Sequence, residues 1–240
     1  MEPTAETGVF TLHMDNGLSV TGANGTTTFS ALVLNANTYK TAAGDDFAVS
    51  TFKYYISNVK LAKADGSTYA VPDTYFLVDH ATPATQALAM KGVPVGDYTG
   101  ISFTVGVDST RTKAVNFTGV LDANNGMYWD MNGPEFINLK LEGRSPQSPT
   151  TGLVFHIAGY KHATTNTIRT VTLPFPTAKL LVRTDHSPEI HMHVDLAKLF
   201  DGPNPVRFGT TYNVMGGLPA ARIADNLAAG MFSVSHIHAN

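Results

Sequence analysis

Histidines recur at alternate positions in two stretches of this sequence of 240 residues. His191 and His193 alternate with aliphatic residues in EIHMHV, and His236 and His238 repeat that spacing in SVSHIH, close to the end of the sequence. His13 lies between a leucine and a methionine in the same alternating way. Because successive side chains of a β-strand point to opposite faces, each pair would present both imidazoles on one face.

Such a pair is suited to metal binding. Two imidazoles on one strand can share a metal ion, a third from a neighbouring strand can complete the site, and neutral imidazole suits copper, zinc, nickel or iron. The alternative is a row of solvated histidines on half-exposed strands and, for the terminal pair, a chain end that frays. The spacing therefore indicates a candidate metal site and leaves the solvated alternative open.

Two further residues could do chemistry away from these pairs. His156 interrupts the apolar run GLVFHIAGY, which indicates a partly buried imidazole that is either a core histidine with a fixed partner or a metal ligand. Trp129, the only tryptophan, lies among turn residues and methionines in NNGMYWDMNGPEF, where it is either a core anchor or a chemically used indole. Met131 would share a strand face with it and offers either packing or a soft thioether for Cu(I).

The elements that must position these residues are short β-type runs separated by glycine, asparagine, aspartate and proline. The expected strands are Val9–Met14, Phe47–Ser57, Asn58–Lys63, Thr74–Asp79, Tyr98–Val107, Leu153–Ala158, Thr170–Leu173, Lys179–Arg183, Glu189–Val194 and Phe232–His238. Helical patterns are confined to Asp195–Gly202 and the alanine-rich Ala220–Met231. These patterns predict an all-β fold, an antiparallel β-sandwich of Ig-like or Greek-key type with one or two short helices near the C-terminus. Because strand patterning continues on both sides of the polar loop 144–152, we expect a single domain over residues 1–240.

Composition restricts the classes of function. With 43% hydrophobic residues the chain can form a substantial core, and a net charge of -3 without a basic block argues against nucleic acid and anionic membranes as partners. No apolar run is long enough to span a bilayer. The sequence has no cysteine, which excludes disulfides and thiolate metal sites. It has no nucleophile elbow, P-loop or dinucleotide motif, and Asp108 in GVDST is expected to stabilise the following loop rather than to act in catalysis.

Several stretches, in the right order, resemble the family of copper-binding proteins named for the methanobactin-operon protein MbnP, especially its members of the Bacteroidetes type. The matching stretches are Ser50–Tyr69, Pro72–His80, Gly92–Arg111, Gly119–Gly143, Phe155–Tyr160 and Ile223–His238. The blocks YYISN, GVDS, GMYW and KLEG are jointly specific, and the resemblance covers most of the chain.

This resemblance implies a secreted or surface-anchored β-sandwich associated with copper. Family members are typically paired with a dihaem cytochrome c peroxidase-like partner, and in some of them a tryptophan is oxidised to kynurenine, whose aromatic amine helps histidines to hold copper. By position in the motifs, that tryptophan is Trp129, and the strand histidine followed by a glycine-containing turn is His156. Relatives often have a second tryptophan and an SGY-like segment where this chain has Asp130–Glu135.

We therefore expect a non-enzymatic copper protein outside the cytoplasm, with zinc as the alternative occupant. The expected ligands are His156 and one of the histidine pairs, with Trp129 close by as an oxidation target. The polar start of the sequence, residues 1–7, shows no signal peptide, so we expect a signal sequence to have been removed. A lipid-bearing cysteine upstream is compatible with this location.

Two other functions fit the same residues. In a cell-surface adhesion or glycan-binding sandwich, exposed aromatic side chains would contact the ligand and the histidines would have no role in binding. Its candidate contacts are Tyr54, Tyr55, Tyr69, Tyr75 and Tyr128. A metal-dependent enzyme would need an acid–base group beside an open metal position, for which Glu189 near His191 is the candidate that is local in sequence.

Overall fold

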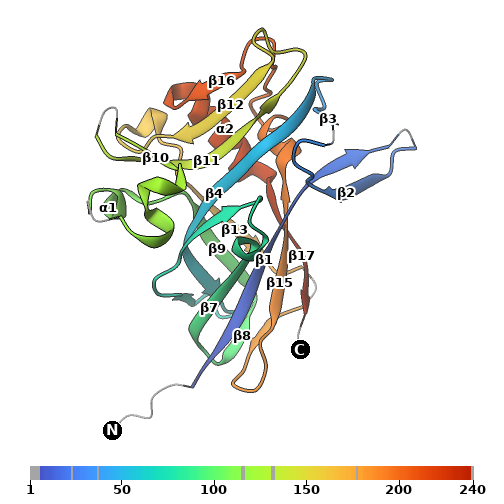
Figure 1. Ribbon diagram of the computed structural model, residues 1–240. Helices are drawn as coiled ribbons and strands as arrows, with labels where there is room; N and C mark the ends of the chain where they lie inside the picture. The colour runs from blue at the N-terminus through green and yellow to red at the C-terminus, as the bar shows by residue number, and fades with distance from the viewer. Residues whose placement is uncertain are drawn as a thin grey trace.

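The computed structural model describes residues 6–22, 24–36, 38–114, 117–130, 133–176 and 178–238. Strands dominate this structure and form two large curled sheets, with the helix α2 (Gly217–Gly230) packed at one end (Figure 1). The all-β sandwich with a C-terminal helix that the sequence predicts is confirmed. Within the described ranges no helix has the length and apolar character needed to span a bilayer.

The first sheet is built around a long N-terminal strand. Its order is β17 (Phe232–His238), β15 (Glu189–Asp195), β1 (Thr7–Thr21) and β2 (Thr27–Ala31), with β7 (Ala87–Pro94) also on β1. The strand β1 is long enough to pair with β7 along its first half and with β2 along its second half. On its other edge β1 runs parallel to β15. Most of the chain separates these two strands, so no short turn forces them to be antiparallel.

The second sheet carries the central strand of the molecule, β4 (Asp46–Ala62). The sheet order is β13 (Arg169–Pro174), β9 (Gly100–Val105), β4, β11 (Glu135–Arg144), β12 (Gly152–Ala158) and β16 (Asn213–Met215). The short strands that pair with β4 or β11 are β3 (Tyr39–Lys40), β5 (Thr68–Ala70), β6 (Tyr75–Asp79) and β10 (Tyr128–Trp129). A separate ribbon joins β8 (Gly96–Tyr98) to β14 (Leu180–Val182).

Three local expectations differ from the structure. The predicted strand Tyr98–Val107 is divided, because β8 ends at Tyr98 and the next strand, β9, covers only Gly100–Val105. The predicted strands Phe47–Ser57 and Asn58–Lys63 are one strand, because Asn58 takes a φ of 51° and bends β4 without ending it. The expected helix Asp195–Gly202 is only a 3-10 turn, Leu196–Leu199. Asp195 caps this turn, because its side chain accepts a hydrogen bond from the Ala197 amide at 3.1 Å. A short α-helix, α1 (Ser109–Thr112), follows β9. Further 3-10 turns are Pro83–Gln86, Gly119–Leu121, Ala123–Asn125 and Ala163–Thr165.

The inner faces of both sheets meet in one hydrophobic core. Ile190 and Met192 of β15 and Phe155 and Ile157 of β12 are all fully buried and belong to this core. Side chains alternate along a strand, so the histidines between these residues point away from the core. His191 and His156 therefore lie on outer faces of different sheets, with the core between them.

The last residue of α2 leaves room for a side chain. Gly230 is helical, and a Cβ there would meet nothing within 4 Å. Because glycine in a helix costs up to about 1 kcal/mol relative to alanine, Gly230→Ala is expected to raise the free energy of unfolding by roughly 0.5 kcal/mol in urea unfolding. Gly44→Ala is the control, since Gly44 is equally open but has a φ of +91° and should lose stability. A loss of stability in both variants would contradict the prediction.

Candidate functional site

Trp129 and His156 lie side by side on the outer face of the second sheet. Their ring centroids are 6.0 Å apart and the rings are tilted by 45°. Trp129 lies opposite Glu135 in the β10–β11 pair, and its indole Nε1 donates to Oε2 of Glu135 at 3.0 Å. The indole is half-buried at the rim of a small aromatic cluster that contains Tyr55 and Phe136. Trp129 therefore packs at the margin of this small cluster and does not anchor the main core between the sheets.

The imidazole of His156 is held at one nitrogen and unpartnered at the other. Its Nε2 lies 2.8 Å from Oε1 of Glu142, whereas its Nδ1 is buried and has no hydrogen-bond partner in the described part of the chain. Burial holds the pKa of His156 below its ordinary value, against the opposing effect of Glu142. A neutral imidazole that donates Nε2–H to Glu142 keeps the lone pair on Nδ1, which is the arrangement of a metal ligand oriented by a carboxylate.

A thioether lies next to this histidine. The parallel pairing of β12 and β16 places Met215 opposite His156. Val214 is buried and Met215 is 51% exposed, so the methionine points outward on the same face as the imidazole. Met215 could not be predicted as a neighbour of His156 from the sequence, because nothing in the local run NVMGG shows which strand lies beside it. Met131, the methionine considered there, lies outside the described residues.

Four histidines form a second cluster on the outer face of the first sheet, which we call the histidine ladder: His13, His191, His236 and His238. The strand registers place His13 opposite His191 and His191 opposite His236. Their rings stack nearly parallel, with centroids 4.7 Å and 4.5 Å apart. The His238 ring stands at 86° to that of His191. The structure thus brings together both members of the terminal pair and one member of the other.

Carboxylates surround the histidine ladder. Oδ2 of Asp15 lies 2.9 Å from Nδ1 of His191, and Oε2 of Glu189 lies 3.6 Å from Nε2 of His13 and 3.9 Å from Nε2 of His191. Two triads keep their donor atoms within 4.8 Å of one another, namely His191, His236 and His238, and His13, Glu189 and His191. Desolvation by the surrounding side chains and the neighbouring imidazoles lower the pKa of the exposed His236, which favours its neutral form.

His193 shares a strand face with His191 but belongs to neither triad. Its ring stacks on Phe29 of β2, with centroids 3.8 Å apart and an angle of 7° between the planes. Phe29 reaches it across β1 at Gly17, where a Cβ would lie 2.6 Å from the Phe29 ring. The structure also separates His156 from the histidine ladder, so the expected combination of His156 with a histidine pair is not assembled within this chain.

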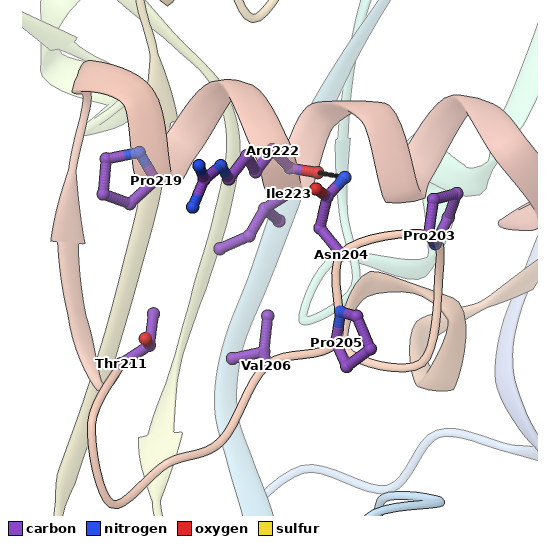
Figure 2. A pocket seen from close by; sticks show the side chains of 8 residues that line it. All are labelled: Pro203, Asn204, Pro205, Val206, Thr211, Pro219, Arg222 and Ile223. Carbon is purple, nitrogen blue, oxygen red and sulfur yellow. Dashed lines mark hydrogen bonds between the residues drawn. The ribbon is translucent and has the colours of Figure 1, made fainter.

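Features that would support other functions lie elsewhere. A cleft of about 370 Å³ between α2 and the loop before β16 is lined by prolines, aliphatic residues, the polar Asn204 and Thr211 and one charged residue, Arg222 (Figure 2). Its lining contains no histidine and no carboxylate. Tyr54 and Tyr55, on which a glycan-binding surface would partly rest, are only 0% and 1% exposed. Glu189 does lie beside His191, as the enzyme hypothesis requires.

Comparisons with known proteins agree with this architecture. The family described as MbnP matches the chain over residues 8–216. Among solved structures, the chain is similar to MbnP from Methylosinus trichosporium, with 16% identity and a TM-score of 0.57, covering 95% of this chain and 98% of that one. At that identity the likeness shows the fold alone. No curated protein matches the chain.

Proposed function

Since the chain belongs to the MbnP family, we propose that it binds copper outside the cytoplasm and is not an enzyme. The observation that carries the proposal is the buried, unpartnered Nδ1 of His156 beside the half-buried indole of Trp129. A buried polar atom without a partner costs stability, and a metal ion would satisfy it. The family is associated with copper, and the resemblance in sequence runs through both residues.

The donors at this place suit Cu(I). The imidazole Nδ1 of His156 and the thioether of Met215 are a borderline and a soft ligand, which together favour Cu(I). Zinc, the alternative occupant, takes nitrogen, oxygen and thiolate donors and gains little from a thioether. Oxidation of Trp129 would add an aromatic amine, because the ring opening that forms kynurenine turns the indole Nε1 into that amine.

We propose that a dihaem peroxidase-like partner oxidises Trp129. Two molecules of peroxide supply the two oxygen atoms that cleave the indole C2–C3 bond, and two molecules of water leave. Hydrolysis of the resulting N-formyl group releases formate and gives kynurenine. Glu135 accepts a hydrogen bond from Nε1 and would hold this nitrogen in place through the reaction. The residue gains one oxygen atom and loses one carbon atom, which an intact mass would show.

The test is Cu(I) affinity, measured by competition with a chromophoric chelator on protein co-produced with the partner. We expect His156→Ala and Trp129→Phe each to weaken binding at least about tenfold, the range seen when groups at a metal site are removed. His162→Ala, in an exposed loop after β12, is the matched control and should bind like the wild type. Wild-type affinity in both site variants would contradict the proposal.

A further inference from the structure

We propose a second metal site on the histidine ladder, in which His191, His236 and His238 bind a borderline divalent ion such as Zn(II) or Ni(II). This site uses neither Trp129 nor His156 and lies on the opposite side of the hydrophobic core from them. It therefore goes beyond the proposed copper function and does not depend on it.

The nitrogen atoms of the triad are already oriented. Asp15 engages Nδ1 of His191 at 2.9 Å, and Oγ of Ser235 lies 3.1 Å from Nδ1 of His236. Both contacts engage Nδ1, so Nε2 of each ring is the nitrogen that can face an ion, in the manner of groups that orient metal-binding histidines. Nε2 of His236 and Nε2 of His238 are 3.0 Å apart. These two nitrogens share a hydrogen bond, whose proton a bound ion would displace. Metal–nitrogen bonds of about 2.0–2.1 Å in a tetrahedral site separate the nitrogens by roughly 3.3 Å. The three donor atoms of the triad lie within 4.8 Å of one another, so side-chain rotations that draw His191 toward the other two would admit an ion.

The surroundings of the triad favour a cation. In the described part of the chain, the carboxylates of Asp15 and Glu189 form ion pairs with histidines alone. Nε2 of His13 is buried without a hydrogen-bond partner, and the nearest carboxylate oxygen, Oε2 of Glu189, is 3.6 Å away. Apart from these imidazoles, no cationic side chain of the described residues lies within ion-pair distance of the two carboxylates, and a divalent ion would compensate their charge. No thioether is part of either triad, so the donor set suits a borderline ion rather than Cu(I).

The position of the triad gives the ion a structural consequence. Among the residues that the structure describes, β17 lies at the edge of the first sheet and pairs with β15 alone. An ion held by His191 of β15 and by His236 and His238 of β17 would fasten this edge strand to its neighbour. Binding should therefore slow amide hydrogen exchange in β17 as well as occupy the imidazoles.

The test uses the whole chain produced without the partner and adds Zn(II) against a chromophoric chelator. We expect one equivalent to bind, and His191→Gln and His238→Gln each to weaken binding at least about tenfold. His193→Gln is the matched control: it lies on the same face of β15, stacks on Phe29, and should leave the Zn(II) affinity unchanged.

A second readout separates metal binding from a folding defect. Zn(II) should slow hydrogen exchange of the β17 amides in the wild type and in His193→Gln but not in His238→Gln, while circular dichroism without metal stays the same in all three. The proposal is overturned if the wild type binds no Zn(II), or if binding survives both triad substitutions. It is also overturned if His13→Gln abolishes binding and His238→Gln does not. Cu(I) binding at His156 should persist in every ladder variant, which keeps the two proposals distinguishable.

Discussion

Replacing Gly159 by alanine is expected to lower the free energy of unfolding by roughly 4 kcal/mol, because it combines a strained backbone with a steric clash. Gly159 has a φ of +141°, a conformation that residues with a Cβ rarely adopt. A Cβ at this position would lie 2.2 Å from the carbonyl oxygen of Thr165. That oxygen belongs to the backbone and cannot swing away as a side chain could, so the loop itself must move.

The movement would spread into a buried polar network. The carbonyl of Gly159 accepts from the Thr167 amide at 2.9 Å, and Thr167 Oγ1 accepts from Asn138 Nδ2 at 2.8 Å. Asn138 in turn accepts from the Val107 amide at 3.1 Å. Each buried polar group that loses its partner costs about 1–3 kcal/mol. Displacement of Gly159 would therefore also weaken the hydrogen bonds of Thr167 and Asn138. Gly159 also follows directly after β12, so the same displacement should disturb His156.

Urea unfolding of Gly159→Ala and of a matched control measures this effect. Gly66 also has a positive φ, +82°, but a Cβ there would meet nothing within 4 Å. Gly66→Ala should therefore cost only the backbone strain, about 1 kcal/mol. Equal losses in the two variants would show that the contact with Thr165 does not matter.

Much of the strand content could be predicted from the sequence, and so could the face on which each histidine lies. Both follow from alternation, which is a local property of the chain. Strand pairing is not local. Nothing in the run around His13 indicates that β1 will lie parallel to β15 and place His13 opposite His191. The histidine ladder could therefore be predicted as separate pairs but not as one cluster.

His191 and His193 show the limit most directly. Their sequence environments are nearly the same, and alternation predicts the same role for both. In the structure their roles differ, because the ring of Phe29 passes over Gly17 of β1 and stacks on His193, whereas His191 stacks on other histidines. Trp129 and His156 could each be identified from the sequence, because both lie in motifs of the family. Their proximity could not be predicted, since it depends on the pairing of β10 and β12 with β11.

Replacing Asp108 by alanine is expected to cost about 3 kcal/mol at neutral pH, of which the lost helix cap accounts for about 1 kcal/mol. Asp108 caps α1 by accepting from the Arg111 amide at 2.9 Å, which is the local role the sequence predicts. The same carboxylate accepts from the Tyr75 hydroxyl of β6 and from Asn58 Nδ2 at the bend of β4. One side chain thus joins three elements. Asp122→Ala, which removes a single cap contact with the Asn124 amide, is the control and should cost much less.

The loss caused by Asp108→Ala should also shrink in acid. Although burial alone would raise the pKa of Asp108, the hydrogen bonds from Tyr75, the Arg111 amide and Asn58 hold that pKa below its ordinary value. A carboxyl whose pKa is lower in the folded chain stabilises the fold above its unfolded pKa of about 3.9, and the stabilisation disappears as the pH falls through the folded pKa. Burial and Asp108 raise the pKa of Tyr75 to about 12, so its hydroxyl remains a donor throughout. Urea unfolding between neutral and strongly acidic pH measures this effect. The free energies of unfolding of the wild type and of Asp108→Ala should approach each other below about pH 4. A difference that does not change with pH would mean that the charge on Asp108 plays no part.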